Sequence, residues 1–349
     1  MGVEKSLFGT MKDGTDIYAY TITNKNGMAA VVMTYGAILK NLYVPDKKGK
    51  KDDVVLGFDK LYRYYRNTDC FGSTVGPICN RTEKGEMVVG KKVYQLDIND
   101  RKKNNLHTHL VEGLHHRVWD AKEGKNAVTF SLVKKDGEMG HPGTIKVSVT
   151  YTLTDKNELK LTYHAESNKN TLMNMTNHSY FNLSGVKSDS IEKHKLTLYA
   201  SKFTPVRKDA IPTGEIADVK GTPFDFTKAK VIGKEVNCFD NIQLKQARGY
   251  DHNWCIDGYN GKMKKCALVE DPKSGRSMEV STDLPGVQFY AGNWIGDLIG
   301  KDGIRNCKRK GLALETQYYP NCAGKSDFEC PIVGPGKPYD TETVYKFNW

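Results

Sequence analysis

The sequence predicts an all-β protein. Apolar and polar residues alternate with a period of two in many segments of the 349-residue chain, and clusters of turn-forming residues separate these segments at short intervals. Convincing helical periodicity is scarce. Half-buried strands produce this alternation, and many strands with closely spaced turns are typical of sandwiches and barrels rather than of alternating strands and helices.

Three segments are predicted to be β-hairpins. Residues 86–96 form strands around Gly90. Residues 144–153 alternate almost strictly and are followed, after a turn cluster, by a second alternating run at 159–165. Residues 266–282 turn at the sequence Asp-Pro-Lys-Ser-Gly, whose residue types favour tight turns. A further strand is expected at residues 196–200.

Only residues 56–67 and 239–247 are candidates for short helices. No linker rich in proline or serine, no shift in composition and no internal repeat divides the chain. We therefore expect residues 1–349 to form a single domain. A chain of this length can bury a core without disulfide or metal support.

Composition argues against several classes of function. The net charge of +11 comes from 52 Lys and Arg against 41 Asp and Glu, and the lysines are spread along the chain, as at residues 47–51. No nucleic-acid motif accompanies them, so we expect no nucleic-acid partner. The eight cysteines form no C-x-x-C pair and are expected to be reduced. No apolar run could span a membrane, and a cytoplasmic location is expected, with a removed signal peptide left open.

Five stretches place charged groups beside aromatic and small polar residues. They are residues 76–85, 104–110, 174–185, 249–254 and 312–321. Aromatic rings pack against the C–H face of a sugar, and charged groups form strong, orienting hydrogen bonds with its hydroxyls. These stretches therefore favour a carbohydrate site.

Each candidate residue also has a structural interpretation. His178 could be a buried structural histidine, although histidine is the usual acid–base residue near neutral pH. Glu315 lies in an apolar strand, where a carboxylate is rare and needs partners. Arg81 and Asp251 could form an ion pair, and Asn80 could form a turn.

Four histidines within ten residues raise the question of a metal site: His107, His109, His115 and His116. No cysteine or carboxylate completes a recognised zinc spacing, so we expect no metal. The chain also lacks the glycine-rich motifs of dinucleotide and nucleotide binding and the G-x-S-x-G elbow of hydrolases.

Taken in order, these stretches resemble the aldose 1-epimerase (galactose mutarotase) family through nearly the whole chain. The most specific motifs are TNHSYFNLSG at residues 176–185 and LETQ-x-x-P at 314–320. Further matches are Asn80-Arg81, Asn105-Leu106-His107, and the stretches at 35–58, 212–216, 222–226, 250–254, 285–294 and 337–347. The resemblance implies a large antiparallel β-sandwich of the supersandwich type, with a sugar in an open cleft and no cofactor. It implies a monosaccharide as partner, and we expect a monomer or weak homodimer.

The resemblance also implies roles for individual residues. Glu315 matches the family's general base and His178 its general acid. The matches to substrate-binding residues are Arg81, Asn80, His107, Asp251 and Gln288. The expected reaction is the interconversion of α and β anomers of a free aldohexose such as galactose or glucose. Since acid and base serve oxygens on the same carbon, we expect their reactive atoms to be roughly 5–8 Å apart.

Three departures from the family pattern are Pro77, His109 and Tyr319. Changes at the last two positions could alter which sugar hydroxyls are read, but they leave the proposed acid and base in place. The alternatives are a hexose-6-phosphate 1-epimerase, which needs an extra basic pocket, and a non-catalytic sugar-binding module, which would not need Glu315 and His178. A glycoside hydrolase normally needs two carboxylates, and the sequence offers one convincing candidate.

Overall fold

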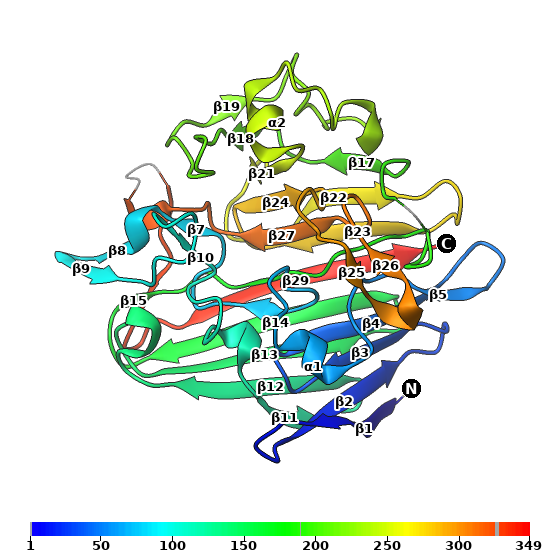
Figure 1. The fold of residues 1–349 in the computed structure, drawn as a ribbon, viewed down its shortest axis with the longest axis horizontal. Coiled ribbons are helices and arrows are strands. Elements are labelled where there is room, and N and C mark those ends of the chain that lie inside the picture. The colour runs from blue at the N-terminus through cyan, green and yellow to red at the C-terminus, as the bar shows by residue number, and fades with distance from the viewer. Residues whose placement is uncertain (1, 189, 325–327) are drawn as a thin grey trace.

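The computed structural model describes residues 2–188, 190–324 and 328–349. Its largest element is a nine-stranded sheet in which every neighbouring pair is antiparallel (Figure 1). In spatial order the strands are β11 (Asp120–Glu123), β12 (Ala127–Lys134), β13 (Ile145–Leu153), β14 (Glu158–Ser167), β29 (Tyr339–Asn348), β23 (Ser277–Thr282), β22 (Lys264–Glu270), β17 (Lys195–Leu198) and β20 (Lys230–Val231).

Two five-stranded antiparallel sheets accompany it. One follows the chain as β1 (Gly2–Thr10), β2 (Asp16–Thr23), β3 (Ala29–Met33), β4 (Ile38–Pro45) and β5 (Lys51–Asp53). The other has the order β19 (Ala217–Asp218), β18 (Lys202–Thr204), β21 (Asp251–Cys255), β24 (Gly286–Tyr290) and β27 (Ala313–Gln317). This second sheet supplies much of the candidate site.

The remaining described elements are short. Pairs of strands are β6 (Thr74–Val75) with β16 (Thr176–Asn177), β7 (Arg81–Thr82) with β10 (Asn105–Leu106), β8 (Glu86–Val89) with β9 (Lys92–Gln95), β15 (Thr171–Leu172) with β28 (Ile332–Val333), and β25 (Leu298–Ile299) with β26 (Arg305–Asn306). The α-helices are α1 (Leu61–Tyr64) and α2 (Ile242–Ala247). The 3₁₀ turns are η1 (Glu83–Gly85), η2 (Leu114–His116), η3 (Glu138–Gly140), η4 (Ile232–Lys234), η5 (Lys301–Gly303) and η6 (Cys322–Gly324).

Alternation along the strands explains why the sheets form a sandwich. In β13 the residues at odd positions from Ile145 to Leu153 are buried, whereas those between them are exposed or half-buried. One face of the large sheet is therefore apolar and must be covered. Tyr20 of β2 packs edge-on against Phe130 of β12, and Thr316 of β27 hydrogen bonds to Thr343 of β29 at 2.6 Å. Both smaller sheets thus pack against the large one.

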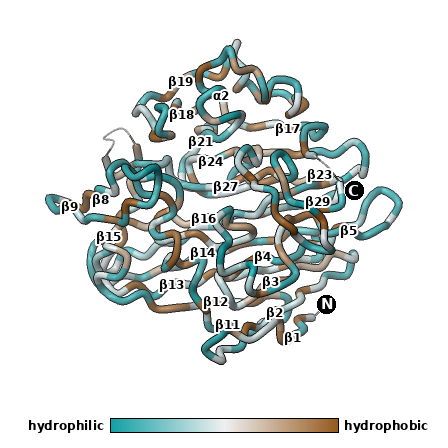
Figure 2. The backbone as a smooth tube through the Cα atoms, viewed as in Figure 1, coloured by the Kyte–Doolittle hydropathy of each residue, from teal (hydrophilic) through white to brown (hydrophobic). Residues whose placement is uncertain are grey.

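The structure confirms the predicted all-β fold and the predicted hairpins. The runs at 144–153 and 159–165 are β13 and β14, the run at 86–96 is β8 and β9, and 266–282 contains most of β22 and all of β23. Both predicted helices exist but are shorter than their patterns, with α2 starting where Asn241 accepts hydrogen bonds from two backbone amides. Hydrophilic residues dominate the loop beside β5, which carries the lysine-rich residues 47–51 (Figure 2).

Within residues 2–188, 190–324 and 328–349, no helix combines the length and apolar character needed to cross a bilayer.

Candidate active site

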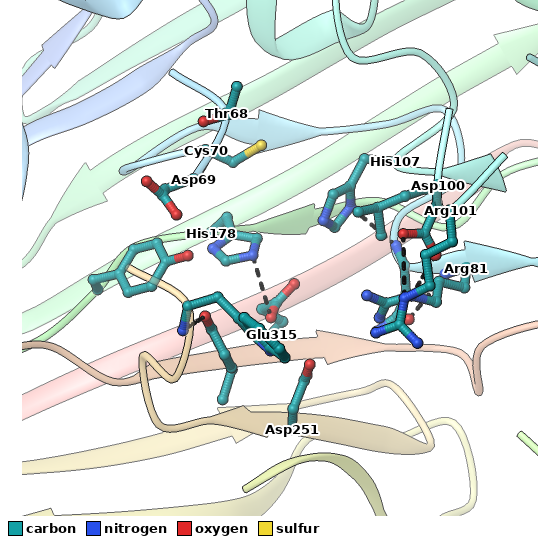
Figure 3. Close-up of a pocket in the computed structure, with 15 residues that line it drawn as sticks. Thr68, Asp69, Cys70, Arg81, Asp100, Arg101, His107, His178, Asp251 and Glu315 are labelled. Atoms are coloured by element: carbon teal, nitrogen blue, oxygen red, sulfur yellow. Dashed lines mark hydrogen bonds and ion pairs between the residues drawn. The ribbon is translucent and has the colours of Figure 1, made fainter. Parts of the chain in front are cut away.

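A cavity of about 360 Å³ lies where the β21–β24–β27 sheet meets the loops around β6, β7, β10 and β16 (Figure 3). A hexose-sized ligand fits this volume. Six predicted site residues line the cavity: Asn80, Arg81, His107, His178, Asp251 and Glu315. The structure therefore brings together residues that lie more than 200 positions apart in the chain. The seventh, Gln288, is not part of the lining.

Strand register places the acidic groups on one face of the sheet. Glu315 pairs with Gln288 across β27 and β24, and Asp251 pairs with Tyr290 across β21 and β24. Directly opposed residues project to the same face, as do residues two apart on a strand. Asp251, Gln288, Tyr290 and Glu315 therefore share the face that borders the cavity.

His178 enters from the other side of the cavity, immediately after β16. Its backbone N–H donates to the carbonyl of Ser73, and its carbonyl accepts from the N–H of Gly72. Three residues later, Phe181 bridges to Leu312 just before β27. These pairings hold the segment 176–182 between β6 and β27 and direct the imidazole toward Glu315 (Figure 3).

His107 and Asn80 are fixed by reciprocal hydrogen bonds. The backbone N–H of Asn80 donates to Nδ1 of His107 at 3.1 Å, and the N–H of His107 donates to the carbonyl of Asn80. Both residues have positive φ, which suits asparagine better than histidine. Because Nδ1 accepts, the proton of neutral His107 is on Nε2, so the ring offers a hydrogen-bond donor at its other nitrogen.

His178 and Glu315 contact each other directly. Nε2 of His178 lies 3.5 Å from Oε1 of Glu315, and both side chains are almost fully buried. The expected separation of 5–8 Å was therefore wrong. The expected distance considered only how each group reaches its sugar oxygen. It neglected the attraction between the imidazole and the carboxyl group, which is strong because both are buried away from water. Oε2 of Glu315 has no hydrogen-bond partner among the described residues.

Burial shifts the two groups in opposite directions. It lowers the pKa of His178 to about 4. It raises the pKa of Glu315 well above its usual range, with a further rise from the charge of Asp251 and an opposing effect of Arg81. Both shifts have the same cause, since a low-dielectric site penalises the charged form. Glu315 is consequently a stronger base, and His178 a stronger acid, than either would be in water.

A chain of hydrogen-bonded side-chain amides leads from Asn80 to the carboxylate of Asp251. Asn80 donates to Gln317, Gln317 donates to Gln288, and Gln288 donates to Oδ1 of Asp251 at 2.7 Å. Gln288 was predicted to bind substrate. One N–H of its amide donates to that carboxylate and so orients Asp251. Direct contact of Gln288 with the sugar stays a prediction.

Arg81 lies between two carboxyl groups. Its Nε donates to Asp100 at 3.0 Å, and its charge opposes the rise that burial causes in the pKa of Asp251. Asp100 also lies 3.9 Å from Arg101. The guanidinium of Arg81 is thus held at the edge of the cavity with donors beside Asp251, as sugar recognition requires.

Sequence reasoning missed several lining residues, including Asp69, Asp100, Tyr290 and Trp294. Asp69 and Asp100 lie in irregular loops where no periodic pattern marks an inward-facing side chain. The site also holds more carboxyl groups than the single convincing one found in the sequence. Tyr290 alternates with Gln288 on β24, and that period-two signal would have identified it.

The two departures that could alter hydroxyl recognition do not line the cavity. Nδ1 of His109 accepts hydrogen bonds from the backbone of Val111 and Glu112. Tyr319 packs edge-on against Phe328 in a separate hydrophobic cluster. Neither side chain borders the cavity, because these family motifs extend beyond the site into the structure that supports it. No group of three or more His, Cys, Asp or Glu side chains in the described part of the chain is arranged to hold a metal ion.

Comparison with known proteins now decides the family. The family model for aldose 1-epimerase matches residues 18–346. The chain belongs to the aldose 1-epimerase family. Galactose mutarotase of Bos taurus is 40% identical over 349 residues, covering 100% of this chain and 99% of the relative. Aldose 1-epimerase of Escherichia coli (strain K12) is 31% identical over 338 residues, covering 96% of each chain.

The fold agrees with that of a solved member of this family. The crystal structure of galactose 1-epimerase from Lactobacillus acidophilus NCFM superposes with a TM-score of 0.86 at 28% identity, covering 100% of this chain and 99% of that one. The fold and the family resemblance expected from the sequence are therefore confirmed.

Proposed function

We propose that this aldose 1-epimerase interconverts the α and β anomers of a free aldohexose, such as galactose or glucose, with Glu315 as general base and His178 as general acid. The observation that carries the proposal is the direct contact of these two buried groups inside a hexose-sized cavity. Family membership supports the reaction, and the geometry supports the assignment of roles.

The reaction opens and recloses a hemiacetal ring. The reactive form of the pair has its proton on His178 and an ionised Glu315. In this form Glu315 removes the proton from the anomeric hydroxyl while His178 protonates the ring oxygen. The bond between C1 and the ring oxygen breaks, and an open-chain aldehyde forms. Rotation about the C1–C2 bond presents the other face of the aldehyde, and the two proton transfers then run in reverse. Each group contributes roughly 10²–10⁴-fold.

The remaining residues hold the sugar during this rotation. Asp251 accepts hydrogen bonds from sugar hydroxyls, while Arg81 and Nε2 of His107 donate to them. Fixing the remote hydroxyls lets C1 rotate without release of the open chain, which would be lost to solvent. Proton transfer by side chains completes the cycle, so the mechanism calls for neither cofactor nor metal. A monomer or weak homodimer in the cytoplasm remains our prediction.

A hexose 6-phosphate is a poorer fit to this cavity. Recognition of a phosphate dianion needs cations that are not already paired. The two lining arginines that the structure describes, Arg81 and Arg101, both lie against Asp100. The silent-module alternative is disfavoured because both proposed catalytic groups are present and in contact.

Polarimetry of freshly dissolved α-D-galactose and α-D-glucose tests the proposal. We expect the purified protein to speed the approach to anomeric equilibrium without moving the equilibrium rotation. Activity should survive exhaustive treatment with EDTA, because the mechanism uses only side-chain protons. Rates equal to those of buffer for every common aldose would refute the function. Loss of activity in EDTA with recovery on adding zinc would refute the proposed mechanism.

A further inference from the structure

Asp69 lies in the cavity but has no role in the mechanism above. It follows α1 in the chain, and its neighbours Thr68 and Cys70 also line the cavity. Figure 3 shows its carboxyl group on one side of His178, with Arg81, Asp100 and Arg101 on the opposite side. Its side chain is half-buried. Asp69 therefore marks the end of the cavity remote from the arginines.

Unlike the other carboxyl groups of the cavity, Asp69 has no partner among the residues that the structure describes. Asp100 is paired with Arg81, Asp251 accepts from Gln288, and Glu315 contacts His178. For Asp69, no ion pair or hydrogen bond to its side chain is found within the described ranges of the chain. Burial raises its pKa to about 6, so at neutral pH it is a charged carboxylate that no described residue pairs with.

The groups around Asp69 do not supply a positive charge. Burial raises the pKa values of Tyr180 and Tyr290, and the charge of Asp69 raises them further, which places both phenols near this carboxylate. Burial likewise raises the pKa of the Cys70 thiol. All three neighbours are neutral at working pH.

The charge of the cavity also differs from that of the chain. Among the lining residues that the structure describes, four carboxyl groups (Asp69, Asp100, Asp251 and Glu315) accompany two arginines (Arg81 and Arg101). The whole chain carries a net charge of +11. An acidic cavity in a basic protein disfavours anionic ligands locally, and Asp69 is the lining carboxylate for which the described ranges of the chain provide neither an ion pair nor a hydrogen bond.

The geometry of the reaction indicates which part of the sugar meets Asp69. His178 serves the ring oxygen, which is bonded to C1 and C5, and C5 carries C6. In the proposed mechanism Asp251, Arg81 and His107 hold hydroxyls elsewhere on the ring. The space beyond His178 therefore faces C5 and C6.

We infer that Asp69 is a further substrate-binding residue that faces the C6 substituent and restricts the enzyme to aldohexoses whose C6 group is neutral or cationic. This inference rests on the proposed function and its assignment of His178 to the ring oxygen. A 6-hydroxyl donates a hydrogen bond to the carboxylate. A 6-ammonium group forms a stronger, charge-assisted one, whereas the 6-carboxylate of a hexuronate is repelled.

Three substrates of similar size separate these effects: D-glucose, D-glucuronate and 6-amino-6-deoxy-D-glucose. Anomerisation rates at pH 7.5 are measured by magnetisation-exchange NMR. For the unmodified protein, kcat/KM should fall in the order amine, glucose, glucuronate, with glucuronate at least about tenfold below glucose. Asp69→Asn should raise kcat/KM for glucuronate and lower it for the amine. The ratio of kcat/KM for the amine to that for glucuronate should therefore fall by at least about tenfold, mainly through changes in KM.

Two further variants control for charge and shape. Asp69→Glu keeps the charge and should keep the discrimination against glucuronate. Asp120→Asn makes the same change in net charge on the exposed edge strand β11 and should leave all three rates unchanged. If the unmodified protein accelerates glucose but Asp69→Asn leaves the substrate ranking unaltered, or if glucuronate and glucose react equally well, the inference about Asp69 is overturned. If glucose itself is not accelerated, the proposed function fails first, and the inference fails with it.

Discussion

Glu315→Gln should lower kcat for galactose and glucose by at least about 100-fold while leaving KM within a few-fold of its original value. The amide matches the carboxyl group in shape and still reaches His178, but it has no basic oxygen to accept the anomeric proton. General-base catalysis contributes roughly 10²–10⁴-fold, so this loss falls entirely on the chemical step. Polarimetry over a range of sugar concentrations separates kcat from KM.

The matched control for this substitution is Glu123→Gln, which makes the same chemical change on the exposed strand β11. It should leave both constants unaltered. His178→Asn should resemble Glu315→Gln, and the double variant should be little worse than either single one, because acid and base act in one concerted step. A loss of less than tenfold in kcat for Glu315→Gln would contradict its role as the base.

Acid should destabilise the protein from about pH 6.5 downward, because most of its histidines are buried. Burial lowers the pKa of seven of the nine histidines: His107, His115, His116, His141, His178, His194 and His252. Burial lowers the pKa to about 4 for His178 and His194 and to about 3 for His141 and His252. The unfolded chain, with histidine pKa values near 6.5, therefore binds more protons than the folded one below that pH.

The sign of the effect follows from this difference. Stability is fully present above about pH 6.5 and is lost as pH falls toward 4, at up to about 1.4 kcal/mol per pH unit for each such histidine. The raised pKa values of Asp69, Asp251 and Glu315 act in the opposite direction, but these groups are fewer. Urea unfolding is measured at pH 7.5, 6.5, 5.5 and 4.5. The free energy of unfolding should change little between pH 7.5 and 6.5 and should fall from pH 6.5 to 5.5 and again to 4.5.

His141 offers a matched variant for this prediction. It is fully buried, and neither ring nitrogen has a hydrogen-bond partner in the described part of the chain. His141→Leu should reduce the slope of stability against pH by about 1.4 kcal/mol per pH unit between pH 6 and 4. A free energy of unfolding that stays constant from pH 7.5 to 5 would show that the buried histidines are not neutral in the folded protein.

Local patterns predicted the strands because burial on one face of a sheet leaves a direct mark on the sequence. The alternation from Ile145 to Leu153 is the clearest case, and it matches the buried positions of β13. The helices left a weaker signal in the sequence. Four residues of α1 and six of α2 are too few to establish a helical period, and tertiary packing sets their ends.

The site was predicted mainly through family motifs, because it is assembled from distant segments. His178 and Glu315 meet only because the segment after β16 runs beside β27, a pairing that no local pattern encodes. The same limit applies to residues beside the cavity. Gln288 shares a face with Glu315 and donates a hydrogen bond to Asp251, but it is not part of the cavity lining. Asp69 was missed because loop conformation alone turns it inward.

A crystal structure of the Glu315→Gln variant with galactose bound tests the central claim most directly. The substitution slows turnover but keeps the shape of the cavity. The account predicts the anomeric hydroxyl within hydrogen-bond distance of the side chain at position 315, the ring oxygen within that distance of Nε2 of His178, and the remaining hydroxyls on Arg81, His107 and Asp251. A sugar bound with C1 turned away from both position 315 and His178 would contradict it.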